Sequence, residues 1–161
     1  MTTKSLFTGR VKMYTSRQDF PNPDARDVRF TAAFKADGSW TVAAGGFTPI
    51  VIKDVQTDDV GTIDITIRLA APAKGTWNAA TGLFTLQARF TFTVVLDIDL
   101  TVKFDADKPH SLPPHPVLQG QLLDATTGEF ALAGEGGFTK FPLAGVKCVL
   151  KISGKFEPIP A

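Results

Sequence analysis

The stretch from residue 84 to residue 104, FTLQARFTFTVVLDIDLTVKF, constrains the fold of this chain more than any other segment. Every even position in it is apolar, and every odd position except Val95 is polar or charged. Because side chains alternate between the two faces of a β-strand, the pattern predicts one buried face and one wet face throughout. A hairpin with a two-residue turn would reverse the alternation, and no reversal is present. We therefore expect a single continuous strand over residues 84–104.

A strand of that length has to curve around the rest of the protein. At about 3.3 Å per residue it would be roughly 70 Å long, whereas a compact chain of 161 residues is only about 40 Å across. Further alternating segments occur at 5–15, 28–34, 60–69 and 146–156, and no segment has a sustained apolar period of 3.6 residues. The sequence predicts an all-β protein with about ten strands and essentially no helix. The strands form an antiparallel meander that closes into a barrel, or into a barrel-like sandwich of two sheets.

Three short loops carry residues typical of tight turns. In Ala36-Asp37-Gly38, the glycine occupies the position of a three-residue hairpin loop that needs a positive φ. The segments 78–82 and 124–128 each begin with Asn or Asp and end with Gly, and the first side chain is suited to cap its turn. These loops predict three cross-strand pairs: Phe34 with Trp40, Trp77 with Phe84, and Leu123 with Phe130.

The length of the chain favours one domain over residues 1–161. Residues 37–48 resemble residues 127–139 with one insertion, and the order of the surrounding segments also matches. This predicts two duplicated halves, 5–55 and 95–146, related by a pseudo-two-fold axis, with the hairpin 70–93 inserted between them. The alternative is that meandering sheets reuse the same turn residues.

The composition argues against several partners. With 17 basic and 16 acidic residues, the net charge of +1 gives no electrostatic reason to expect nucleic acid or an anionic membrane. No run approaches the roughly 20 apolar residues of a membrane helix, and a membrane-inserting β-hairpin is disfavoured because 84–104 has no central turn signal. The N-terminus has no apolar signal-peptide region, which predicts a cytoplasmic protein and leaves export by a signal-less route open.

The two histidines, His110 and His115, both lie in the proline-rich segment 106–116. Their spacing fits no standard metal pattern, and no cysteine cluster completes a site, so we expect neither a metal nor a cofactor. A site made of Asp105, Asp107 and His110 is the weaker alternative to a solvated loop. Because ordered loops on rigid scaffolds often carry function, both histidines remain candidate ligand-binding residues.

The sequence predicts no catalytic residue. Asp97 and Asp99 would lie roughly 7 Å apart on one strand face, a separation that could suit an acid–base pair. They share that face with Thr101 and Lys103, however, so a solvated surface is the favoured interpretation. The single cysteine, Cys148, is in phase with apolar neighbours and is expected to be a buried, unreactive thiol.

Thirteen phenylalanines against one tyrosine indicate an aromatic interior rather than an aromatic binding face. The leading hypothesis is a non-catalytic binding module that holds a small apolar ligand in a Phe-lined barrel. The candidate ligand-binding residues are Phe30, Phe34, Trp40, Phe90, Phe92, Phe104, His110 and His115. One alternative is a structural or protein-interaction domain with a filled core, which could self-associate through its sheet edges. Another is a cofactor-free cyclase or isomerase that uses the same cavity, which sequence alone does not separate from a binder.

Overall fold

The computed structural model describes residues 2–15, 25–56, 62–94, 98–104, 118–138 and 147–160. Within these residues the regular structure consists of eleven β-strands with no helix, which confirms the predicted all-β class with one strand more than expected. The strands are β1 (Thr2–Thr15), β2 (Arg26–Lys35), β3 (Ser39–Phe47), β4 (Ile50–Gln56), β5 (Thr62–Leu69), β6 (Ala73–Asn78), β7 (Leu83–Val94), β8 (Ile98–Phe104), β9 (Leu118–Asp124), β10 (Glu129–Phe138) and β11 (Lys147–Glu157).

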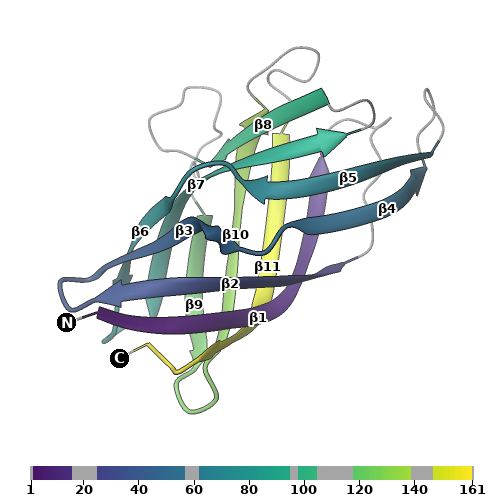
Figure 1. Cartoon of the computed structure of the whole chain (residues 1–161). Helices are drawn as coiled ribbons and strands as arrows, with labels where there is room; N and C mark the ends of the chain where they lie inside the picture. The colour runs from purple at the N-terminus through teal and green to yellow at the C-terminus, as the bar shows by residue number, and fades with distance from the viewer. Residues whose placement is uncertain are drawn as a thin grey trace.

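All eleven strands belong to one antiparallel sheet, and the sheet closes on itself (Figure 1). The closed ring runs β7–β9–β10–β11–β1–β2–β3–β6 and back to β7, with each strand hydrogen-bonded to the next. Beyond the ring, the second half of β7 pairs with β5 and β8, and β4 extends the sheet from β5. This ring is the expected barrel-like closure. Closing the sheet into a ring leaves few strand edges free.

The prediction of one continuous strand over 84–104 is wrong. β7 and β8 are paired antiparallel, from Val94 opposite Ile98 to Ala88 opposite Phe104. Residues 95–97, which connect the two strands, lie outside the described residues. A connection with an odd number of residues pairs even positions with even positions, so the alternation continues through the hairpin unchanged. The predicted burial is confirmed in β7, where the even residues from 84 to 92 are all buried.

The predicted turns form, with one correction. Gly38, Gly82 and Gly128 have φ values of 86°, 72° and 79°. Phe34 lies opposite Trp40, and Trp77 lies opposite Phe84, as expected. In the third hairpin the predicted partner of Phe130 is wrong, because a register shift places Leu122 there. The displaced residue, Leu123, is 60% exposed on the outer surface.

Side chains at the start of these turns accept backbone hydrogen bonds, as the sequence predicts. Asn78 Oδ1 accepts from the amides of Ala80 and Thr81 at 2.9 and 3.3 Å. Asp124 Oδ1 accepts from the amide and hydroxyl of Thr126 at 2.8 and 2.6 Å. The hydroxyl bond, followed by the amide bond, holds the pKa of the Asp124 carboxyl below its usual value.

The lowered pKa of Asp124 predicts an acid-dependent loss of stability. A carboxylate whose folded pKa is lowered stabilises the fold above its unfolded pKa of about 3.9, and the contribution disappears as the pH falls through the folded value. Asp124→Asn should therefore show a smaller drop in Tm between about pH 5 and pH 2 than the wild type. Asn78, an amide in the equivalent turn, supports the use of Asn here. Equal drops in thermal scans of the two proteins would contradict the prediction.

The core is aromatic at the end of the barrel where the turns of Gly38, Gly82 and Gly128 lie, which we call the turn end. Its rings contact one another with centroid separations such as 4.7 Å for Phe84 and Phe130 and 5.4 Å for Phe34 and Trp40. The Trp40 indole N–H donates to the Thr85 carbonyl oxygen at 2.8 Å, which satisfies the polar atom of a fully buried side chain. The opposite end of the interior is lined mainly by aliphatic side chains, including those of β4, β5 and β11. The apolar faces predicted from alternation thus meet in one core.

The duplication of residues 5–55 and 95–146 stays a prediction. In the first half β1 pairs with β2 and β2 with β3, and in the second half β10 pairs with both β8 and β9. Residues 105–117 and 139–146, which the duplication also involves, lie outside the described residues. The described part of the chain contains no helix long and apolar enough to cross a membrane.

Candidate functional site

The predicted ligand-binding aromatics in the described interior are all buried: Phe30, Phe34, Trp40, Phe90 and Phe92. They do not form one lining. Phe34 and Trp40 stack on each other in the turn-end cluster, and Phe90 contacts Phe47 at 5.5 Å nearer the aliphatic end. Phe104 lies in β8 opposite Ala88, whereas His110 and His115 lie outside the described residues. Binding by these residues stays a prediction.

Two small spaces lie among the inward-facing side chains that the structure describes. One is bordered by Phe30, Leu86 and Leu118, and the other by Met13, Ile52 and Ile67. Each has a volume of about 10 Å³, which is about the room that one water molecule needs. A drug-sized ligand needs several hundred Å³, so these two spaces would have to expand greatly to hold one.

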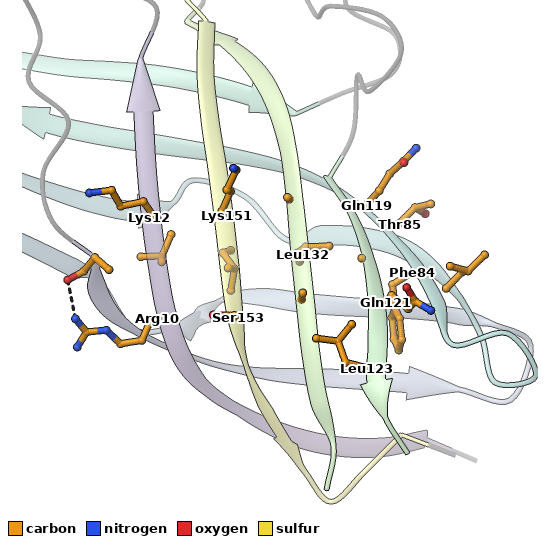
Figure 2. A pocket seen from close by; sticks show the side chains of 17 residues that line it. Arg10, Lys12, Phe84, Thr85, Gln119, Gln121, Leu123, Leu132, Lys151 and Ser153 are labelled. Carbon is orange, nitrogen blue, oxygen red and sulfur yellow. Dashed lines mark hydrogen bonds between the residues drawn. The ribbon is translucent and has the colours of Figure 1, made fainter. Parts of the chain in front are cut away.

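A much larger hollow lies on the outside of the barrel, across β1, β11, β10, β9 and β7 (Figure 2). We call it the outer groove; its volume is about 750 Å³. Strand register explains its shape, because outward-facing residues of neighbouring strands align in rows. One row consists of Arg10, Ser153, Ala131, Gln121 and Leu83. The next row consists of Lys12, Lys151, Ala133, Gln119 and Thr85.

Small side chains form the floor of the outer groove, and long ones form its two walls. Ala131 and Ala133 on β10 occupy the middle of the rows, with Arg10, Lys12 and Lys151 on one side and Gln119 and Gln121 on the other. Gly120 brings β9 close to β10, since a Cβ at this position would lie 2.5 Å from the Ala131 carbonyl oxygen. The hollow therefore results from the sizes of aligned residues.

The wall on β1 and β11 is cationic. Arg10 forms an exposed ion pair with Asp27 at 2.9 Å and also donates to the Ala25 carbonyl oxygen. Lys12 and Lys151 are direct cross-strand partners. Their Nζ atoms lie 5.7 and 5.5 Å from the centroid of the Tyr14 ring, within the range of cation–π attraction.

The opposite wall is neutral and partly apolar. Gln119 and Gln121 on β9 extend from the surface beside Thr85 (Figure 2). Leu83 and Leu123 are 55% and 60% exposed, and both line the groove. The sequence analysis missed this surface because it took its candidate aromatic ligand-binding residues from the buried face of the strands. The available signal was the pair Ala131 and Ala133 at outward positions of a long strand.

The other candidate reactive groups raised by the sequence are the cysteine, the aspartates and any cluster of metal-ligating side chains. Cys148 is fully buried, and burial raises the pKa of its thiol to about 12, so the thiol stays protonated at neutral pH. No group of three or more potential metal-ligating side chains occurs in the described ranges. Asp97, Asp105 and Asp107 lie outside them, and Asp99 is opposite Thr93 in the β7–β8 pair.

No family model, curated protein or solved structure matches this chain. The functional proposal therefore depends on the residues and geometry of the chain itself.

Proposed function

We propose that this protein is a non-catalytic binding domain that holds a small, largely apolar ligand in the outer groove. The contrast in available space carries the proposal: about 750 Å³ outside the barrel against about 10 Å³ in each of the two spaces found among the described interior residues. Small-molecule sites typically have volumes of roughly 300–1,000 Å³ and combine apolar surface with a few polar groups. The outer groove fits that description, because its floor consists of small apolar side chains and its walls combine polar, charged and apolar ones.

The chemistry of the lining favours binding over catalysis. Among the described residues that line the outer groove there is no histidine, cysteine or carboxylate. These are the groups that most often act as general base or nucleophile. The groove does contain amide, hydroxyl and ammonium groups, which can orient a ligand by hydrogen bonds and charge.

Sheet edges are a weaker basis for function. Within the described strands β4 pairs only with β5, so one edge of β4 is available. A register shift between Ile52 and Val55 interrupts that strand, and Lys53 is exposed beside it. Bulges and lysines are the usual protection of an edge against further strands. Pairing with another chain through β4 is therefore less favoured than binding in the outer groove.

Filling the groove tests the proposal. The neutral fluorescent probe N-phenyl-1-naphthylamine should bind saturably to the wild type, and Ala133→Phe should weaken its binding at least about tenfold by occupying the floor. Ala33→Phe is the matched control, because Ala33 also faces outward, on β2, but does not line the groove. Unchanged affinity in Ala133→Phe would contradict the proposal and favour an interior site. Absence of saturable binding to the wild type would also count against it.

A further inference from the structure

Three neutral polar side chains that line the outer groove make no hydrogen bond among the described residues: those of Ser153 on β11 and of Gln119 and Gln121 on β9. Other polar groups of the lining are already engaged. The Thr85 hydroxyl bonds to that of Thr76 at 2.7 Å, and Arg10 is held by Asp27 on the side away from β11. Ligand sites orient their ligands with a few polar groups on a largely apolar surface. These three side chains can therefore bond a ligand without breaking an existing contact.

Two of these side chains lie on either side of the floor. Ser153 is paired with Ala131, and Ala131 is paired with Gln121, so the three residues form one row across β11, β10 and β9. Two strand spacings of about 4.8 Å separate the Cα atoms of Ser153 and Gln121, or roughly 10 Å in all. A hydroxyl and a carboxamide both donate and accept hydrogen bonds. A ligand lying on Ala131 thus has a versatile polar group at each side.

The floor between these groups has the proportions of a flat ring system. Ala131 and Ala133 are two residues apart on β10, about 7 Å along the strand. Neither side chain extends beyond a methyl group, so the surface between β11 and β9 is low and apolar over roughly 7 by 10 Å. Leu123, which is 60% exposed and two residues beyond Gln121, adds apolar surface. A fused-ring molecule lying face down would bury apolar area against both methyl groups.

We infer that the outer groove selects flat fused-ring molecules that carry a hydroxyl or carbonyl group at two opposite edges. One face of the ring system lies on Ala131 and Ala133, one edge bonds to Ser153, and the opposite edge bonds to Gln121. Gln119, on the same strand as Gln121, is a further partner for that second edge (Figure 2). The inference rests on the proposed function and names the ligand class of the same site.

Three uncharged molecules with one ring system test the role of the two edges: 2,6-dihydroxynaphthalene, 2-naphthol and naphthalene. In displacement of bound N-phenyl-1-naphthylamine, the dihydroxy compound should bind at least about tenfold more tightly than naphthalene, with 2-naphthol between them. Ser153→Ala/Gln121→Leu should reduce the affinity for the dihydroxy compound about tenfold and change that for naphthalene by no more than about twofold. Gln87→Leu is the control and should bind like the wild type, because Gln87 is exposed on β7 but does not line the groove.

The outcomes separate this inference from the proposed function. If Ala133→Phe weakens binding of N-phenyl-1-naphthylamine but the three naphthalenes bind equally, the groove is a binding site and the ligand class is overturned. The ligand class is also overturned if Ser153→Ala/Gln121→Leu affects the dihydroxy compound no more than Gln87→Leu does. If the fluorescent probe does not bind, or if Ala133→Phe leaves its affinity unchanged, both proposals fail.

Discussion

Replacing Phe156 with alanine should lower the free energy of unfolding by about 3–5 kcal/mol, among the largest effects expected for a single change in this protein. The Phe156 side chain is fully buried on β11, where it lies at the centre of the aromatic cluster. Removing it would lose the burial of its apolar surface and leave a cavity among rings that cannot fully collapse. Six rings surround it with centroid separations of 4.9–6.4 Å: Phe7, Phe30, Phe34, Trp40, Phe84 and Phe130.

Equilibrium urea unfolding followed by far-ultraviolet circular dichroism measures this loss. Small domains have a total stability of about 5–15 kcal/mol, so Phe156→Ala could be partly unfolded in water. Phe156→Leu, which keeps more of the side-chain volume, should lose less and remain measurable. Leu83→Ala is the control, because Leu83 is 55% exposed and its truncation should change stability by only about 0.5 kcal/mol. A loss below about 1 kcal/mol in Phe156→Ala would contradict the packing described above.

The β7–β8 hairpin shows that side-chain alternation predicts which residues are buried but not where the chain reverses direction. Alternation reports which face a residue occupies, and it predicted the buried side of β7 correctly. It does not report chain direction when the connection has an odd number of residues, because positions of the same parity, such as 94 and 98, are then paired. The better signal was length: a strand of roughly 70 Å is too long for a compact chain of this size. That conflict favoured a turn near the middle of the stretch over a long curved strand.

The sequence predicted local pairings better than distant ones. The pairs Phe34–Trp40 and Trp77–Phe84 depend on turn residues a few positions away, and both are present. The predicted pairing of Leu123 with Phe130 failed because a register shift between Glu129 and Phe130 places Leu122 opposite Phe130. Ring closure through β1–β11 and β7–β9 joins segments far apart in the chain, and alternation does not specify the partner.

The outer groove was not predictable for a related reason. Its floor is a local feature, two alanines at outward positions of β10. Its walls come from strands near both ends of the chain and from β9. Only the registers of four strand pairs place Lys12 and Thr85 in one row. A groove on a closed sheet is thus set by non-local register, which the composition and the turns leave open.

Gly75→Ala is also expected to be strongly damaging, with a loss of about 2–6 kcal/mol. Gly75 lies on β6 opposite Trp40 of β3. A Cβ there would overlap the Thr85 carbonyl oxygen and lie 2.7 Å from Trp40 Nε1. That oxygen accepts the hydrogen bond of the buried indole, so the added methyl would separate donor and acceptor or push β6 away from β7. Overpacking and the loss of a buried hydrogen bond each cost about 1–3 kcal/mol.

Gly45→Ala provides the matched control, because a Cβ at Gly45 of β3 would meet no atom within 4 Å. Its unfolding free energy should stay within about 0.5 kcal/mol of the wild type, since the same substitution meets no obstacle there. Urea unfolding gives the energies, and the indole N–H signal of Trp40 in ¹H–¹⁵N spectra reports the hydrogen bond directly. If Gly75→Ala matched Gly45→Ala in both measurements, β6 and β7 would not approach each other as closely as the structure requires. A loss confined to Gly75→Ala, with a shifted Trp40 signal, would instead tie the stability of the barrel to the absence of a side chain beneath the indole.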